Sequence, residues 1–419
     1  MKKNNSKTNR LKLLLFIFFS FPLIIECQNS QFIEALNYKQ SANINGLSNN
    51  PYTLITSCFF NKTINDEIIW GSSRVSDNYH FTMLDTKEYK ITDLNIDFNA
   101  FKNKIPKRDY EQLMFYGFSS VIKTKLFVAV TVGNVIFFFK GDGSSLSYIR
   151  TEYIEESIEF SNCFANTDST LILLDYRATY EGEAKIKAFS YNFRTSYINQ
   201  VFEQPMSSNS ACFDRTSTRF YDSNKHYFLI TDNLEYKIYL FDNIGNELFG
   251  YEKPLSISEL SKHLLNPSKK VTGGFDSIVN ELKLTSRILN TQFLNDSDII
   301  VSYCVKPVLE KNGISIKNSM IDLLTIRKDK IVFKKTYDDT YLYEQLEFKK
   351  TGRINQSMFN PSVRNSLFYF FSGNFLINFD FKQMIPKSNT TFSKFIRKAK
   401  FSVLSLKSNL VFSVYEFKY

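Results

Sequence analysis

The sequence predicts an all-β chain folded as a six-bladed β-propeller of four-stranded antiparallel blades, with one short helical insertion. Three observations support this: a strand-turn-strand pattern that recurs along the chain, a polar lead-in before most copies, and abundant aromatic residues. The chain has 42 Phe and 24 Tyr, and aromatic residues make up 16 % of it, which suits half-buried pleated surfaces. With 14 Gly and 9 Pro, collagen-like and Pro-rich disordered classes are excluded.

The N-terminus has the composition of an export signal. A basic stretch that ends at Lys12 precedes an almost purely apolar run from Leu13 to Ile25. This run of 13 residues is shorter than the roughly 20 needed for a comfortable membrane span. We therefore expect residues 1–27 to be a secretory signal peptide, and a retained N-terminal anchor is the alternative.

Cys27 lies at the end of this segment and is a candidate for lipidation, as in an exported lipoprotein. Glu26 argues against it, because the residue before the modified cysteine is normally small. The mature chain is expected to be secreted, periplasmic or held at the cell surface. A lipid on Cys27 would be its membrane anchor.

The positive charge of the chain is scattered. Residues 1–27 contribute +4 of the net +10, which leaves +6 for residues 28–419. Scattered charges are usually a solvated surface, and the alternative is attraction to an anionic polymer or membrane. Nucleic acid is not an expected partner, because the chain has no basic run and no known binding motif.

Residues 28–419 are expected to form one propeller domain built from repeated units. Each unit has an apolar strand such as Leu126–Val132, followed by a more alternating strand such as Lys185–Tyr191. A strand that is apolar on both faces, followed by a strand with one solvent-exposed face, indicates a sheet that stacks on neighbouring sheets. Sheets stacked in this way around an axis form a propeller. The units span approximately residues 52–95, 112–155, 158–205, 210–254, 288–338 and 355–419.

The lead-in places three cysteines in one context. Cys58, Cys163 and Cys212 each lie in a Ser/Thr-x-Cys-Phe sequence, and Thr291-Gln-Phe293 resembles a degenerate copy. With Cys304, four cysteines remain in the mature chain, which allows 3 pairings if all are bridged. Buried free thiols are the default expectation, since Cys packs well in β cores and this spacing does not fit zinc.

Two regions depart from the repeat. Residues 255–285 are predicted to be helical, because Ser256-Ile-Ser-Glu259 is a capping box before an apolar stretch. In a repeat protein such an insertion is often on the binding face, and the alternative is a plug that packs against a blade. Residues 28–50 and 401–419 are the candidates for the strand that closes the ring.

One unit resembles a known family. Tyr227–Asp232 followed by Ile238–Leu248 is similar to a blade of exported six-bladed propeller proteins of the TolB-like and NHL-like type. The resemblance implies a secreted or lipid-anchored protein that binds proteins, glycans or peptides through one face of the ring. Those proteins have no universal catalytic motif, so the resemblance assigns no functional residue.

The residues themselves indicate no catalytic, cofactor-binding or metal-binding site. His80, His226 and His263 have no metal-ligand neighbour at helical or hairpin spacing, and the Asp296/Asp298 and Asp338/Asp339 pairs lack the pattern of a calcium loop. The sequence therefore favours a binding module for a protein or carbohydrate. The alternative is a propeller-fold hydrolase or lyase that acts on a glycan or ester at the channel mouth. A two-sheet sandwich with a second domain is a third interpretation.

Overall fold

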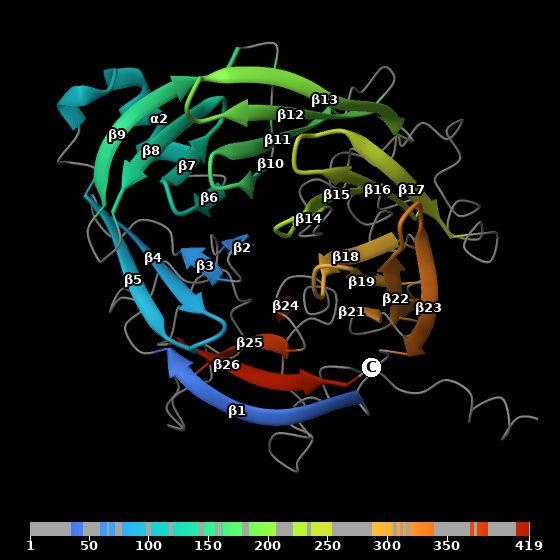
Figure 1. Ribbon diagram of the computed structural model, residues 1–419. Helices are drawn as coiled ribbons and strands as arrows, with labels where there is room; N and C mark the ends of the chain where they lie inside the picture. The colour runs from blue at the N-terminus through green and yellow to red at the C-terminus, as the bar shows by residue number, and fades with distance from the viewer. Residues whose placement is uncertain are drawn as a thin grey trace, which may run out of the picture.

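The computed structural model describes the segments that make up the sheets and their turns. These are residues 35–44, 59–64, 67–71, 78–97, 102–116, 120–141, 146–155, 158, 160, 162–177, 184–206, 221–232, 236–253, 287–304, 308–310, 313–315, 319–338, 369–372, 375–383 and 408–418. Within them the chain forms six four-stranded antiparallel sheets. Figure 1 shows these sheets arranged around a ring in a propeller-like fold, and we number them in chain order.

Five of the sheets are simple meanders whose strand order follows the chain. Sheet 1 is β2 (Phe59–Lys62), β3 (Glu67–Gly71), β4 (Asn78–Asp85) and β5 (Ile91–Asp97). Sheet 2 is β6 (Ser120–Lys123), β7 (Val128–Val132), β8 (Val135–Lys140) and β9 (Ser147–Tyr153). Sheet 3 is β10 (Asn162–Thr167), β11 (Thr170–Arg177), β12 (Ala184–Asn192) and β13 (Tyr197–Met206). In each, the first strand lies nearest the centre of the ring and the fourth at its rim (Figure 1).

The next two sheets repeat this order. Sheet 4 is β14 (Tyr221–Ser223), β15 (Tyr227–Asp232), β16 (Lys237–Asp242) and β17 (Glu247–Glu252). Sheet 5 is β18 (Arg287–Phe293), β19 (Asp298–Cys304), β22 (Ser319–Ile326) and β23 (Ile331–Asp338). A two-stranded hairpin, β20 (Val308–Glu310) and β21 (Gly313–Ser315), is inserted between β19 and β22.

Sheet 6 joins the two ends of the chain. It consists of β24 (Tyr369–Ser372), β25 (Phe375–Gln383), β26 (Ser408–Phe417) and, as the outer strand, β1 (Leu36–Ile44). β1 pairs antiparallel with β26 from Leu36↔Phe417 to Ile44↔Leu410. Both segments that the sequence singled out for closure therefore belong to one sheet, with β1 as the strand donated from the other end.

The hydrophobic core lies between neighbouring sheets. The second strand of sheet 2, β7, is apolar on both faces and is buried throughout, from Val128 to Val132. Side chains of sheets 1 and 2 form one cluster, those of sheets 2 and 3 another, and the same holds for sheets 3 and 4, 4 and 5, and 5 and 6. Burial on both faces is what requires the sheets to stack, as the uninterrupted apolar runs predicted.

Outer strands share a local irregularity. In five sheets the pairing of the third and outer strands contains one extra residue on the outer strand, a β-bulge that increases local twist and interrupts a flat edge. These extra residues are Lys39, Ile149, Val201, Leu248 and Lys334. The bulges thus protect the rim, where each outer strand leaves one edge unpaired.

Two regions contain elements that were not predicted from the sequence. The α-helix α2 (Lys107–Tyr116) and the 3₁₀ helix η3 (Lys102–Lys104) lie between sheets 1 and 2, and the β20–β21 hairpin lies within sheet 5. Helix α2 had a readable signal: the carbonyl of Pro106 accepts its first hydrogen bonds, and Asp109 lies in its first turn. None of the helices in the described segments is both long and apolar enough to cross a membrane.

The Phe that ends the Ser/Thr-x-Cys-Phe lead-in does not occupy the same position in the first strand of every sheet. Phe59 and Phe164 each lie three residues before the last paired residue of their strand, whereas Phe293 is itself the last paired residue of β18. Moving a side chain by an odd number of residues along a strand places it on the other face of the sheet. Phe164 accordingly packs toward sheet 4 and Phe293 packs back toward sheet 4 from sheet 5, so the degenerate copy in sheet 5 is not structurally equivalent.

Several of the sequence predictions concern residues that lie outside the described segments. These are the signal segment 1–27 with Cys27, the helical insertion 255–285, Cys58, Cys212, His263 and Asp339. The side chains of His80, Cys304 and Asp338 are also outside what the structure describes.

Candidate functional site

In a four-stranded antiparallel sheet, the first-to-second and third-to-fourth turns lie at the same end. We call this end of the ring the turn face. It comprises residues 63–64, 86–90, 124–127, 168–169, 193–196, 224–226, 243–246, 294–297 and 327–330. Connections between sheets leave from the opposite end.

Side-chain oxygens cap most of these turns. Asn224 Oδ1 accepts hydrogen bonds from the backbone N–H groups of His226 and Tyr227, both at 2.8 Å. Asn295 Oδ1 does the same for Ser297 and Asp298, also at 2.8 Å. Equivalent caps are made by Asp85, Thr124, Asn192 and Asp242. Such short polar side chains replace the missing ladder bonds of a tight turn, so the loops are held in fixed conformations.

Asp242 makes the most extensive cap. One of its oxygens accepts from three successive N–H groups and the other accepts from the Asn246 amide at 2.8 Å. Burial opposes ionisation of Asp242, but these hydrogen bonds together outweigh it and lower its pKa. The carboxylate is therefore ionised, and its turn rigid, at any physiological pH.

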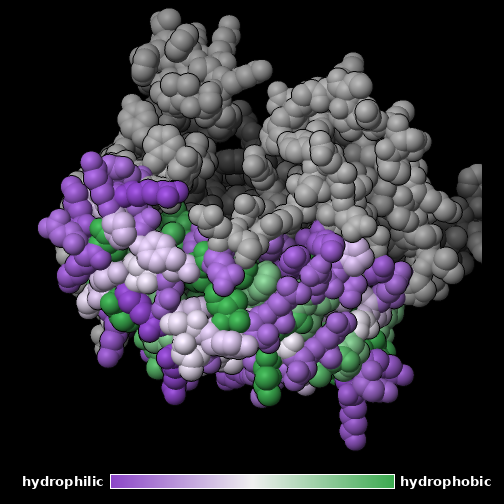
Figure 2. Space-filling view, turned by 90° about the horizontal axis from the view of Figure 1, so that it is seen from above, coloured by the Kyte–Doolittle hydropathy of each residue, from purple (hydrophilic) through white to green (hydrophobic). Residues whose placement is uncertain are grey.

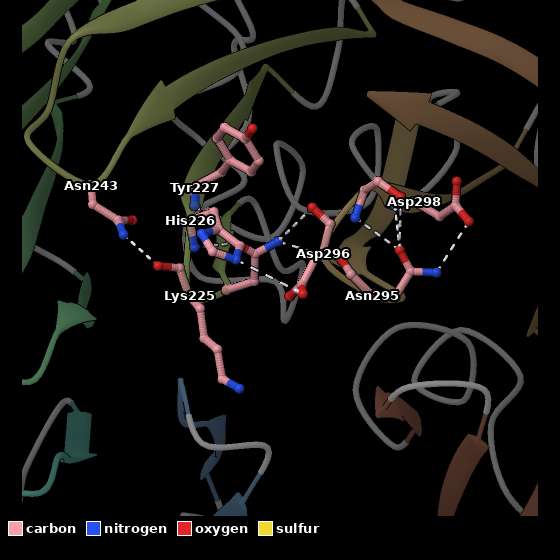
Figure 3. Close-up of polar contacts among 9 residues, drawn as sticks. Lys225, His226, Tyr227, Asn243, Asn295, Asp296 and Asp298 are labelled. Carbon is pink, nitrogen blue, oxygen red and sulfur yellow. Dashed lines mark hydrogen bonds and ion pairs between the residues drawn. The ribbon is translucent and has the colours of Figure 1, made fainter. Parts of the chain in front are cut away.

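Polar links also connect the turns of different sheets, as Figure 3 shows for sheets 4 and 5. The Asn224 amide donates to the carbonyl of Asn295 at 3.4 Å, and His226 Nε2 lies 3.9 Å from Asp296 Oδ2. Both side chains of this last pair are more than half exposed. Between sheets 3 and 4, the Asn166 amide donates to the carbonyl of Asn243 at 2.8 Å.

A buried ion pair crosses the ring at its centre. Lys62 Nζ, from the first strand of sheet 1, lies 3.7 Å from Asp222 Oδ2, from the first strand of sheet 4. The side chains are 5 % and 2 % exposed. Lys62 also donates to the carbonyl of Phe293 at 3.3 Å, and Asp222 accepts from the N–H of Phe293 at 2.8 Å. Three first strands, from sheets 1, 4 and 5, are thereby tied together across the axis; we call this contact the axial pair.

A second buried network lies at the opposite end, between sheets 4 and 5. Lys253, the residue after β17, donates to Asp322 Oδ2 at 2.7 Å and to the Tyr303 hydroxyl at 2.8 Å. Asp322 has no exposed surface and also accepts from Tyr236 at 2.7 Å and from Thr336 at 2.6 Å. We call these five residues the Lys253 network.

Aromatic rings enclose the lysine of this network. Its ammonium lies 4.7 Å from the centroid of Tyr303 and 5.6 Å from those of Tyr236 and Phe333, a cation–π arrangement. Burial, followed by the charge of Asp322, raises the pKa of Tyr236 well above its ordinary value. Tyr236 therefore stays protonated and acts as a hydrogen-bond donor. The network fixes the point at which the chain leaves sheet 4 toward residues 254–286.

The structure gives the two acidic candidates of the sequence, Asp296 and Asp298, different environments. Asp298 is buried under the turn of sheet 5: burial opposes its ionisation, but hydrogen bonds from Lys334, Thr325 and Asn295 outweigh this and lower its pKa. Lys334 Nζ lies 2.9 Å from it. Asp296, two residues earlier, is exposed and faces His226. The two acids thus have structural roles in the turn of sheet 5.

Cys163 is a buried free thiol in β10, as expected. Complete burial raises the pKa of its thiol far above the ordinary value, so it is a packing residue. Among the described side chains, no group of three or more His, Cys, Asp or Glu is placed to hold a metal ion.

Sequence reasoning missed the axial pair and the Lys253 network. A signal was available for the network, because Asp322 interrupts the apolar strand Ser319–Ile326. None was available for Lys62, because its strand Phe59–Lys62 is half polar. A charge within a buried strand requires a partner. The sequence does not say which residue that partner is.

Comparison with known proteins assigns no family. No family model matches the chain, and no curated protein does. Solved structures with similar folds include the N-terminal domain of Nup159 (10 % identity, TM-score 0.35, covering 73 % of this chain and 68 % of that one). A hypothetical selenium-binding protein from Sulfolobus tokodaii matches at 10 % identity and TM-score 0.37, over 66 % and 64 % of the two chains.

PorZ, a bacterial surface component of the type-IX secretion system of Porphyromonas gingivalis, matches at 8 % identity and TM-score 0.31. The match covers 79 % of this chain and 35 % of PorZ, so this chain spans little more than a third of that protein. At these scores the likenesses carry no argument about function.

Proposed function

We propose that this chain is an exported six-bladed β-propeller, of the TolB-like or NHL-like type, that works as a binding module for a protein or glycan. In this proposal the six sheets are the blades, residues 1–27 direct export, and Cys27 is a candidate lipid attachment site. The Lys253 network is the observation that carries the proposal. A buried, fully bonded anchor at the start of a long connection positions that connection on the rigid ring.

The long connection in question is residues 254–286, which joins sheet 4 to sheet 5 at the end opposite the turn face. Most connections in compact domains have about 2–6 residues, and much longer ones are usually functional. We place partner binding at this end of the ring. The helical insertion predicted at 255–285 lies within this connection, and in this proposal it is the element that contacts the partner.

The test is a pull-down from the native surface fraction. Wild-type protein is compared with a variant in which residues 254–286 are replaced by a Gly-Ser linker of equal length, and with the control variant Lys225→Gln/Lys328→Gln/Lys330→Gln on the turn face. We expect one partner to be recovered by the wild type and the control and lost by the linker variant. Thermal unfolding checks that all three fold.

An enzymatic role is the outcome that would replace this proposal. Turnover of a panel of glycans and esters by the wild type, with no partner recovered, would contradict the binding-module function. Intact mass of the purified native protein tests the N-terminal part separately: a mass that includes residues 1–27 contradicts processing, and a mature mass without added lipid contradicts lipidation of Cys27.

A further inference from the structure

The turn face carries an excess of exposed positive charge. All the basic side chains among its described residues are exposed, namely Lys87, Lys90, Lys125, Arg194, Lys225, Arg327, Lys328 and Lys330. Its acidic side chains are Glu88, Asp168, Asp296 and Asp329, and the carboxylates of Asp85 and Asp242 cap two of its turns, so eight basic side chains face six acidic ones. Two of those acids already face basic partners, Asp168 facing Lys125 at 3.7 Å and Asp296 facing His226. The scattered charge of the sequence thus becomes a net positive surface at one end of the ring.

Hydrophobic side chains project beside these charges. Ile244, at the tip of the β16–β17 turn, is 80 % exposed, and Tyr197, at the start of β13, is 65 % exposed. The turn that presents Ile244 is rigid, because Asp242 caps it and Gly245 packs against Val201. Figure 2 shows the same mixture from the side of the ring, where isolated hydrophobic side chains lie among hydrophilic ones.

Lys225 is oriented for an external contact. Its carbonyl accepts a hydrogen bond from Asn243, which fixes the backbone. In Figure 3 its side chain extends away from the linked amides of the turn. Its exposed ammonium group is therefore carried by a backbone that a hydrogen bond holds in place.

The N-terminal strand enters the fold at this same face. Leu36, the first residue of β1, pairs with Phe417, and the carbonyl of Ala35 accepts from the N–H of Lys418. Residues 28–35 separate Cys27 from β1, and an extended chain of that length spans at most about 28 Å. An anchor within residues 1–27, whether an uncleaved apolar segment or a lipid, would thus hold the turn face close to a membrane.

We propose that the turn face is a docking surface for a membrane with anionic headgroups. The exposed lysines and arginines contact the headgroups, while Ile244 and Tyr197 enter the interfacial layer. The same surface does not favour an acidic protein, because two exposed apolar side chains on separate sheets suit a fluid interface better than one complementary pocket. This inference is independent of the partner-binding proposal, which concerns the opposite end.

Co-sedimentation with vesicles tests the inference on the full-length chain. Vesicles of phosphatidylcholine alone measure the contribution of the apolar N-terminal segment, and vesicles that also contain phosphatidylserine measure the added charge-dependent binding. The variant Lys225→Gln/Lys328→Gln/Lys330→Gln removes three charges from the turn face. Because each basic residue near an anionic surface contributes about fivefold, we expect the added binding to fall roughly 100-fold.

A matched variant controls for net charge. Lys104→Gln/Lys107→Gln/Arg108→Gln removes three exposed charges from η3 and α2, in a connection at the other end of the ring, and should leave the binding within about twofold of wild type. The variant Ile244→Ser should weaken the charge-dependent binding roughly tenfold. Equal losses in the two triple variants, or no preference of the wild type for phosphatidylserine vesicles, would overturn the proposal.

Discussion

Replacing either member of the axial pair should strongly destabilise the protein. Lys62→Met removes the ammonium but keeps most of the side-chain length, and Asp222→Asn removes the charge but keeps an oxygen that accepts from Phe293. Two unit charges 3.7 Å apart attract by about 4.5 kcal/mol at an effective dielectric constant of about 20. Because both side chains are at least nine-tenths buried, each single substitution removes the charge that compensates the other one, at a cost of about 3–5 kcal/mol.

The double variant separates the ion pair from the packing around it. With both charges removed no stranded charge remains, so Lys62→Met/Asp222→Asn should be no less stable than either single variant. The free energies of unfolding should then give a coupling of at least about 3 kcal/mol. Urea-induced unfolding, followed by near-UV circular dichroism, measures all four proteins.

An exposed pair with the same geometry is the control. Lys125 Nζ is also 3.7 Å from its carboxylate, Asp168 Oδ2, but the two side chains are 71 % and 36 % exposed. Lys125→Met should therefore cost less than about 1 kcal/mol. If Lys62→Met costs no more than Lys125→Met, or if the two single effects simply add in the double variant, the axial pair does not hold sheets 1, 4 and 5 together.

Three further predictions concern the sheets and their turns. Gly245→Ala should cost about 1–3 kcal/mol, because φ is +99° and an added Cβ would lie 2.7 Å from Val201 Cγ1; Gly133→Ala, with φ +53° and open space around it, should cost only about 1 kcal/mol in urea unfolding. Burial raises the pKa of Tyr251 from 10.0 to about 12. The folded protein therefore keeps the Tyr251 proton to higher pH than the unfolded chain does, and the free energy of unfolding should fall between pH 10 and 12. Tyr251→Phe should reduce that fall, which thermal unfolding across this pH range measures. Cys163 should resist thiol reagents until the protein unfolds, and peptide mass mapping that finds it modified under native conditions would contradict its burial.

The sequence predicted the strands well because their signal is local. Uninterrupted apolar runs indicated the second strands, as in Leu171–Leu174, and alternation indicated the third, as in Lys237–Phe241. The turn at Asn243–Gly245 was equally readable, since its residues suit a tight reversal. All these features depend on neighbours within a few positions, so a single sequence contains them.

The candidate sites were much less predictable. Nothing near Lys253 in the sequence points to Asp322, which lies 69 residues away. Charged turn residues such as Lys225 and Lys328 also look like ordinary solvated positions until the fold gathers them at one end. Helix α2 was overlooked for a different reason: its apolar periodicity is weak, and Lys107–Tyr116 overlaps the start of the unit predicted at 112–155.

By itself, then, the sequence determined the all-β class, the order of the repeated strand units along the chain, and an N-terminal segment with the composition of an export signal. Only the tertiary structure decided which strand completes sheet 6, which charges meet across the axis, and which turns share a face. Lys62 and Phe293 are 231 positions apart, and they meet because stacking sheets on both faces curves the chain back to its start. Local periodicity specifies a strand and its faces, but contacts across a ring depend on how many sheets stack and at what twist, which no short stretch of sequence contains.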